Sequence, residues 1–147
     1  MNWKRLAEVL DSARHRVRLR RWDREHAWGR RAEDLAHRYL ERNGFVVVSR
    51  NYSRRGGGGE LDLVAWEGET LVFVEVKART GEQINSAESA VDAHKREHLL
   101  LTASEYLRRA RIPWERARFD IVSVVAGDLP EIRHIRSAFQ TRKTKPN

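Results

Sequence analysis

The sequence predicts a single α/β domain, and three observations support this prediction. The 147 residues are 40% hydrophobic, which suffices for one packed core and is too little for two. Helical and strand-like periodicities follow one another in the order α, α, β, β, β, α, β, β, without an internal repeat. No apolar run reaches the roughly 20 residues that a membrane-spanning helix needs, and no signal-peptide pattern is present. We therefore expect a soluble, cytoplasmic protein with no membrane span.

The N-terminal fifth of the chain is strongly basic. The net charge is +8, and residues 1–31 contribute +6 of it through ten basic and four acidic side chains. Between the arginines, apolar residues recur at helical spacing, which predicts a basic amphipathic helix over residues 3–21. These apolar residues are Leu6, Leu10, Ala13 and Val17. Such a helix can lie on DNA, lie on an acidic membrane surface or fold back on the domain, and the pattern also fits a poorly ordered arm.

The remaining elements follow from residue 29 onwards. Residues 30–42 have one apolar helical face, and Asn43-Gly44 supplies a left-handed stop. A second long helix is predicted over residues 86–110, ending near Ile112-Pro113. A polar, glycine-rich loop is expected over residues 51–59. Strands are predicted from β-rich runs bounded by turn residues, and they cover residues 45–49, 60–66, 71–78, 119–125 and 132–139.

These elements define the predicted domain organisation. We expect residues 1–28 to form a basic helical extension and residues 29–139 to form the main domain. Residues 140–147 are expected to be a flexible tail, because chain ends without apolar periodicity are seldom held by packing.

Two acids and a lysine on neighbouring strands form the candidate catalytic site. If the four-residue turn pairs Trp66 with Leu71, the antiparallel register places Asp62 opposite Glu75, with Cβ atoms about 5 Å apart. Glu75 and Lys77 project from the same face of their strand, because side chains alternate. Facing carboxylates repel one another in a bare sheet, whereas a divalent cation between them makes the arrangement favourable. The alternative is a solvent-facing ion pair on an edge strand, where charge prevents aggregation.

The composition limits which metal could bind there. The chain has no cysteine, so thiolate-held zinc and iron–sulfur centres are excluded and a hard divalent cation with oxygen ligands fits best. His94 and His98 are one helical turn apart, but a third zinc ligand is not evident. A lysine beside such a metal can position a water molecule or stabilise charge on a pentavalent phosphate. This residue set indicates phosphodiester hydrolysis.

Several short motifs between residues 29 and 139 resemble the YraN family of bacterial proteins. They are Gly29-Arg-Arg-Ala-Glu33, Tyr39-Leu40, Asn43-Gly44, Arg50-Asn51-Tyr52, Gly59-Glu60-Leu-Asp62-Leu-Val64, Phe73-Val-Glu75-Val-Lys77-Ala-Arg79 and Lys95. That family is similar to the PD-(D/E)XK nucleases and, among them, to archaeal Holliday-junction resolvases. The resemblance implies a restriction-endonuclease-like fold, in which helices flank a central mixed β-sheet. One departure is Leu61, which stands before the first acid where the motif usually has proline.

The resemblance also assigns roles to individual residues. It makes Asp62 and Glu75 ligands of Mg²⁺ or Mn²⁺, Lys77 the lysine of the motif, and Glu33 a further catalytic acid that reaches the metal. Glu33 has an alternative explanation, because a carboxylate in the first turn of a helix is favoured by the helix dipole. Glu60 is a secondary candidate, which either assists the metal or holds the end of its strand near an arginine.

DNA is the expected partner. Most of the cations are arginine, whose planar guanidinium suits phosphate. The candidate phosphate-binding residues are Arg30, Arg31, Arg54, Arg55, Arg79 and Lys95. The expected activity is a metal-dependent endonuclease acting on DNA shape, with branched or damaged DNA as candidate substrates. Two alternatives stay open: a catalytically silent nucleic-acid-binding module, and an adaptor that docks through the N-terminal helix. A homodimer is also left open.

Overall fold

The computed structural model describes residues 3–80 and 93–139. Two compact units are present, Met1–Arg31 and Ala32–Asn147. Helix α1 (Trp3–Arg42) passes from the first unit into the second. The two helices predicted over residues 3–21 and 30–42 are therefore one, and the predicted interruption is wrong. The residues between them contain no proline, and the single Gly29 lowers helix stability by only about 1 kcal/mol.

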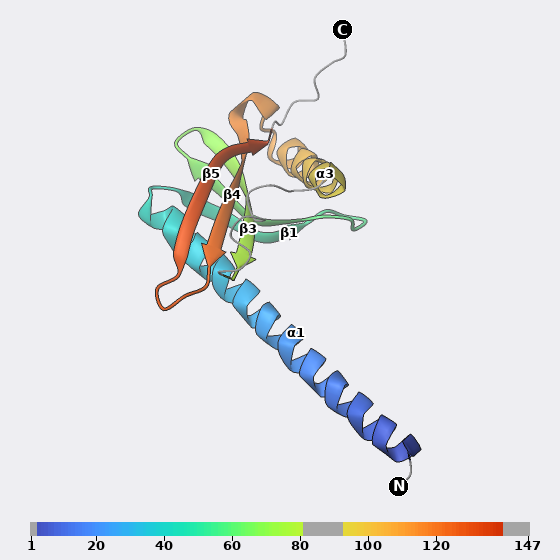
Figure 1. Cartoon of the computed structure of the whole chain (residues 1–147). Helices are drawn as coiled ribbons and strands as arrows, with labels where there is room; N and C mark the ends of the chain where they lie inside the picture. Colours follow the sequence, from blue (N-terminus) through green and yellow to red (C-terminus); the bar gives the residue numbers. More distant parts are fainter. Residues whose placement is uncertain (1–2, 81–92, 140–147) are drawn as a thin grey trace. The chain divides into compact units, whose positions relative to one another are not determined.

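A five-stranded mixed sheet forms the centre of the second unit (Figure 1). Its strands lie in sequence order, and only the β3–β4 pair is parallel. The chain makes this parallel pair by crossing over through helix α3 (Ala93–Ala110), as parallel strands require. The strands are β1 (Val46–Ser53), β2 (Glu60–Glu67), β3 (Thr70–Arg79), β4 (Ala117–Val125) and β5 (Glu131–Phe139), with a short 3₁₀ turn η2 (Trp114–Arg116) before β4.

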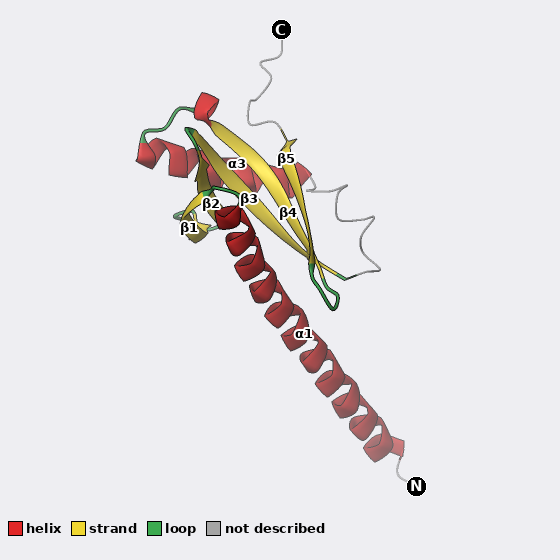
Figure 2. Ribbon diagram, turned by 90° about the vertical axis from the view of Figure 1, so that its left-hand side faces the viewer, coloured by secondary structure: helices red, strands yellow, loops and turns green. Residues whose placement is uncertain are grey.

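Helices cover both faces of the sheet. Leu99, Ala103 and Leu107 of α3 pack against Leu71 and Phe73 in one core cluster, and Figure 2 shows α3 beside the strands. Alternation along β3 turns Val72 and Val74 to the other face, where the buried residues Ala32, Ala36 and Leu40 lie on one side of α1. Each large apolar side chain buried in this way contributes about 1.5–3 kcal/mol. This confirms the α/β class and is consistent with a restriction-endonuclease-like fold.

The predicted glycine-rich loop is shorter than expected and is closely packed. Strand β1 continues to Ser53, because it pairs with β2 as far as Glu60. A Cβ atom added at Gly59 would overlap the Thr102 hydroxyl and lie 2.9 Å from the carbonyl oxygen of His98. Gly59 is therefore a point of close packing between the β1–β2 hairpin and α3.

The limits of the other predicted elements agree with the structure within a few residues. The start of the helix predicted over residues 86–110 and the tail over residues 140–147 lie outside the described residues. None of the described helices combines the length and apolar content needed to cross a lipid bilayer.

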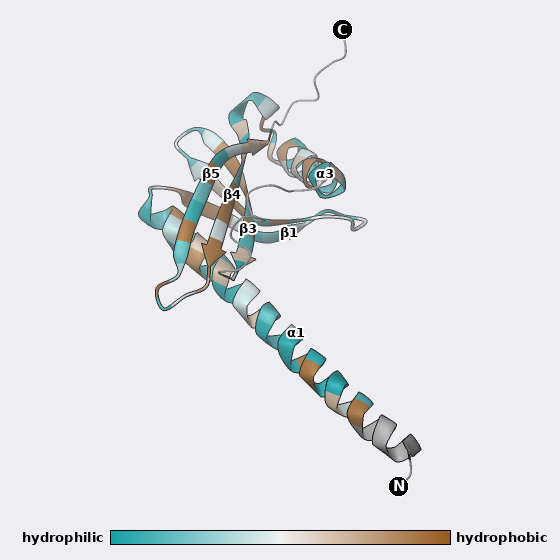
Figure 3. Ribbon diagram, viewed as in Figure 1, coloured by the Kyte–Doolittle hydropathy of each residue, from teal (hydrophilic) through white to brown (hydrophobic). Residues whose placement is uncertain are grey.

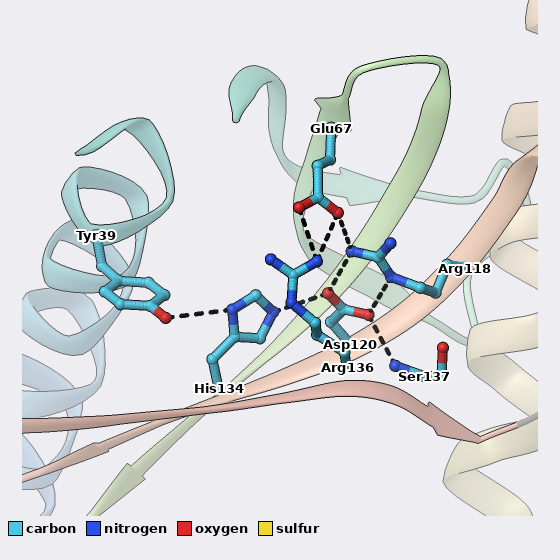
Figure 4. Close-up of polar contacts among 7 residues, drawn as sticks. All are labelled: Tyr39, Glu67, Arg118, Asp120, His134, Arg136 and Ser137. Carbon is cyan, nitrogen blue, oxygen red and sulfur yellow. Dashed lines mark hydrogen bonds and ion pairs between the residues drawn. The ribbon is translucent and has the colours of Figure 1, made fainter. Parts of the chain in front are cut away.

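A buried ionic network joins β4 to β5 (Figure 4). The Asp120 side chain is fully buried, accepts two hydrogen bonds from the Arg118 guanidinium, at 2.8 and 3.0 Å, and lies 2.7 Å from Nε2 of His134. It also accepts the backbone N–H of Ser137 at 3.0 Å. Although burial disfavours the charge, these hydrogen bonds outweigh it and hold the pKa of Asp120 below its usual range.

The same network reaches the β2–β3 turn and helix α1. Glu67 accepts hydrogen bonds from Arg118 at 2.7 Å and from Arg136 at 2.6 Å. On the other side, the hydroxyl of Tyr39 lies 3.4 Å from Nδ1 of His134. Four elements are thus connected through the sheet face that α1 covers.

Candidate active site

The β2–β3 hairpin has the register that the sequence predicts. Trp66 pairs with Leu71, and the antiparallel pairing continues to Leu63 and Val74. The pairing ends at Leu63 and Val74, so Asp62 and Glu75, which the sequence places directly opposite one another, are not a pair of this ladder.

At that point the Asp62 side chain replaces a backbone acceptor. Its Oδ2 accepts the Val76 N–H at 2.7 Å. The carboxylate of Asp62 therefore lies against the backbone of β3 directly after Glu75, which places both acids at the end of the pairing.

Irregular backbone surrounds Asp62. Leu61 and Val64 both pack into the α3-side core although they are three residues apart, so the simple alternation of β2 is interrupted at Asp62 and Leu63. On the neighbouring strand β1, Asn51 has a φ of 51°, a left-handed conformation that Asn tolerates better than most residues. The candidate acid Asp62 thus lies where the sheet is distorted.

Glu75 is buried and surrounded by ammonium groups. Its side chain is 5% exposed, and its Oε1 lies 3.4 Å from Nζ of Lys77. Nζ of Lys95, from helix α3, contacts the same oxygen. Lys77 is itself largely buried, whereas the Lys95 side chain is 46% exposed. One buried carboxylate therefore faces one inner lysine and one lysine that also reaches solvent.

Burial and like charge perturb the protonation of these groups. Burial, followed by the nearby Glu75 carboxylate, raises the pKa of Asp62 to about 8, although the hydrogen bond from Val76 opposes the shift. Burial lowers the pKa of Lys77, and Glu75 only partly offsets this. Burial also acts to lower the pKa of Lys95, but the contact with Glu75 outweighs it and the pKa is raised. Such opposed shifts within one cluster are typical of functional sites.

Glu33 is close enough to this cluster to act on it electrostatically. It extends from α1, and its Oε2 lies 3.8 Å from the Arg50 guanidinium. Burial raises the pKa of Glu33; Arg50 and a hydrogen bond with Asn51 oppose the shift, and Glu60 adds to it. The charge of Glu33 in turn contributes to the raised pKa of Asp62.

The acids do not form a complete metal-binding shell. Within residues 3–80 and 93–139, no group of three or more His, Asp or Glu side chains is arranged to hold a metal ion. The secondary candidate Glu60 is exposed and accepts a 3.5 Å hydrogen bond from Ser53. Asp62 and Glu75 are thus the central pair; the charge of Glu33 acts on Asp62, and the charge of Glu60 acts on Glu33.

The predicted phosphate-binding residues have varied surroundings. Arg30 and Arg31 are exposed on α1. Arg54 donates to the Gly57 carbonyl oxygen, and Arg55 is exposed with its backbone N–H 3.4 Å from Glu105. Arg79 is partly buried at the end of β3, and its Nε has no hydrogen-bond partner among the residues that the structure describes.

Sequence reasoning missed three contributions to this site. Lys95 was expected to bind phosphate, but its contact with Glu75 depends on how α3 packs, which no local pattern reveals. Asn51 and Arg50 act on Glu33 from β1. Their position in the Arg50-Asn51-Tyr52 motif was the only available indication.

The donor groups fit a hard divalent cation at the central pair. Asp62 and Glu75 offer carboxylate oxygens, which Mg²⁺ and Mn²⁺ prefer. Burial, followed by the charge of Glu75, raises the pKa of Asp62 even though Lys95 is nearby. A cation bound between the two carboxylates would favour their charged forms.

Comparison with known proteins identifies the family. The model of "Uncharacterised protein family UPF0102" matches residues 32–124. The chain belongs to this family. The predicted resemblance to the YraN family, which is UPF0102, is thereby confirmed.

Relatives named "UPF0102 protein" match over most of their length. One from Solibacter usitatus is 50% identical over 131 residues, covering 89% of this chain and 98% of the relative. A second, from Rhodococcus jostii, is 45% identical over 115 residues, covering 77% and 96%. A third, from Pelotomaculum thermopropionicum, is 40% identical over 114 residues, covering 76% and 93%. Their names describe no activity.

Proposed function

We propose that this UPF0102 protein is a metal-dependent endonuclease that hydrolyses phosphodiester bonds of DNA in the cytoplasm. The observation that carries the proposal is the pair Asp62 and Glu75, two acids that the fold keeps close to one another, despite burial and mutual repulsion, at a site with two lysines. A structural sheet gains nothing from this charge arrangement, because each buried ionic group costs several kcal/mol of desolvation.

Asp62 and Glu75 would hold Mg²⁺ or Mn²⁺, with Glu33 as an outer acid. A divalent cation in this place supplies stabilisation of charge on the phosphoryl group and acidifies water. Arg50 restrains Glu33 at 3.8 Å, so this acid is held near the pair without directly contacting it. The Val76 N–H keeps the Asp62 carboxylate aimed at the site.

The two lysines would have different roles in binding the phosphate. Lys77 is largely buried beside Glu75, so its ammonium group is positioned to donate to an oxygen of the scissile phosphate as charge develops there. Lys95 reaches solvent while it contacts Glu75. It would leave that carboxylate for the incoming phosphate when another cation takes its place.

The substrate is proposed to be recognised by shape. The candidate phosphate contacts are arginines and lysines, which position a duplex without reading its sequence. Branched or damaged DNA is therefore a better candidate than a defined sequence, and a homodimer would suit a two-fold symmetric junction.

The test is cleavage of labelled linear, single-stranded and four-way-junction DNA with Mg²⁺, with Mn²⁺ and with chelator. Wild-type protein is compared with Asp62→Asn and Glu75→Gln, and with Glu97→Gln as the matched control at an exposed position of α3. We expect metal-dependent cutting by the wild type and the control and at least a 100-fold loss in both site variants. Equal cutting by all four proteins would indicate a contaminating nuclease and contradict the proposal.

One observation favours a second candidate, a nucleic-acid-binding module without turnover. No group of three metal-binding side chains is assembled among the described residues. This alternative predicts that wild type and Asp62→Asn bind DNA equally and that neither cuts it with any metal.

A further inference from the structure

We infer that residues 10–31 of α1 form a binding surface for double-stranded DNA, with the helix lying in the major groove. The inference shares its partner, DNA, with the proposed function, but it concerns a different unit of the chain and requires no catalysis.

This segment is an exposed, arginine-rich helix. Residues 10–27 are all exposed. Residues 10–31 contain eight arginines and three acids. At 1.5 Å per residue the segment is about 33 Å long, so its arginines can reach several successive phosphates.

The arginines flank a narrow apolar stripe on both sides. Leu10 and Val17 are seven residues apart and share one side of the helix, because seven residues make about two turns. With 100° between residues, Arg14, Arg18 and Arg21 lie to one side of this stripe and Arg16, Arg20 and Arg24 to the other. A major groove admits a helix between two walls of phosphates, so cations on both flanks match its charge.

The distribution of apolar residues disfavours a membrane surface. Leu19 and Trp22 are about half exposed and lie 120–180° around the helix from Leu10. A membrane-bound amphipathic helix instead collects its large apolar side chains on one face. Figure 3 shows hydrophobic positions of α1 separated by hydrophilic ones.

Most of these guanidinium groups are available to an external anion. Arg21 pairs with Glu25 at 3.2 Å, but both side chains are more than 60% exposed. Arg16 donates to the backbone oxygen of Ser12 at 3.4 Å. Among the described side chains, no carboxylate forms an ion pair with Arg14, Arg18, Arg20 or Arg24.

The geometry also selects the kind of duplex. The major groove of A-form RNA is deep and narrow and excludes protein elements, whereas that of B-form DNA is about 12 Å wide. Duplex DNA should therefore bind through these arginines, and duplex RNA of the same sequence should not.

The test measures binding by fluorescence anisotropy in chelator, so that no cleavage occurs. The probes are a 20-base-pair DNA duplex, an RNA duplex of the same sequence and vesicles of neutral or anionic lipid. The full chain is compared with a variant carrying Arg14→Gln, Arg18→Gln, Arg20→Gln and Arg24→Gln. Arginine and glutamine have similar helix propensities, and circular dichroism checks that the helix remains.

A second fourfold variant controls for net charge. It carries glutamine in place of four exposed arginines of the other unit, Arg38, Arg42, Arg108 and Arg111. We expect the helix variant to bind duplex DNA about 10- to 100-fold more weakly than wild type, with the slope of log K against log salt shallower by about 3 to 4. The control should remain within a few-fold of wild type.

Three results would overturn the inference: equal weakening in both fourfold variants, equally tight binding of RNA through the same arginines, and loss of vesicle binding with DNA binding unchanged. The variant Asp62→Asn distinguishes this inference from the nuclease proposal, because it should lose cleavage and keep duplex binding through the helix. A wild type that binds duplex DNA through the helix but never cuts would support the inference and refute the nuclease. A helix variant that still cuts DNA and binds it with unchanged affinity would refute the inference and support the nuclease.

Discussion

Replacing Asp62 by asparagine should remove a pH-dependent loss of stability from the metal-free protein. The pKa of Asp62 is raised from 3.8 to about 8 in the folded chain. Between these values the folded protein retains a proton that the unfolded chain has released, so the free energy of unfolding falls as pH rises. One pKa unit corresponds to about 1.4 kcal/mol. A shift of about four units therefore costs the wild type on the order of 5 kcal/mol between pH 4 and pH 8.

The assay is urea unfolding of both proteins in chelator at pH 5, 6, 7, 8 and 9. Asparagine retains an oxygen that can accept the Val76 N–H, so the substitution removes the charge and leaves this contact. The stability of the variant relative to wild type should rise across the series and level off above pH 8. Added Mg²⁺ should stabilise only the wild type at high pH. Parallel stability curves for the two proteins would show that the Asp62 carboxylate is not strained by burial and by Glu75.

Three further substitutions probe other parts of the molecule. Asp120→Asn should lower the free energy of unfolding by about 3–5 kcal/mol, because it breaks a buried ion pair. In thermal melts the control variant Asp128→Asn, at an exposed position, should match wild type. An equal effect of both substitutions would refute the stabilising role of the network. Gly59→Ala should lower the free energy of unfolding by about 1–3 kcal/mol, because the added methyl group overlaps α3. In the control variant Gly127→Ala the methyl group meets only an ordinary contact at 3.5 Å. Equal stabilities of the two variants in chemical denaturation would argue against close packing at Gly59. Glu33→Gln should reduce the apparent Mg²⁺ affinity in the cleavage assay about 10- to 100-fold. An unchanged metal titration would leave Glu33 with its pairing to Arg50 alone, because α1 is continuous and Glu33 does not lie in a first helical turn.

The hairpin was predictable because local chemistry determines it. The turn contains Gly68, whose φ is +58°, and apolar alternation on both sides permits one register. The pairing of Trp66 with Leu71 follows from these features. The placement of two acids and a lysine at one end of the hairpin was therefore accessible from the sequence. Their roles in metal binding and cleavage stay predictions.

Features that depend on contacts between distant segments could not be predicted. The continuity of α1 was missed because arginine-rich stretches give a weak periodic pattern, although arginine is a good helix former. Lys95 reaches Glu75 only after α3 has packed on the sheet. The Asp120 network was missed because single charges within strands normally indicate a solvent-facing position. In the fold, the Arg118 guanidinium pairs with that aspartate, and Nε2 of His134 lies 2.7 Å from it.

The hydrogen bond between Asp62 and the Val76 N–H allows the structural requirement at position 62 to be distinguished from the proposed functional one. The backbone needs an oxygen there, since the β2 main chain no longer supplies one, and asparagine would satisfy that need without charge. Under the proposed function, aspartate is required because asparagine lacks the charge that would bind the cation. Homologous chains can therefore be compared at this position. Asparagine would indicate a protein that keeps the hydrogen bond to the β3 backbone and lacks the proposed metal chemistry. Alanine would indicate a protein in which this end of the β2–β3 hairpin has a different structure.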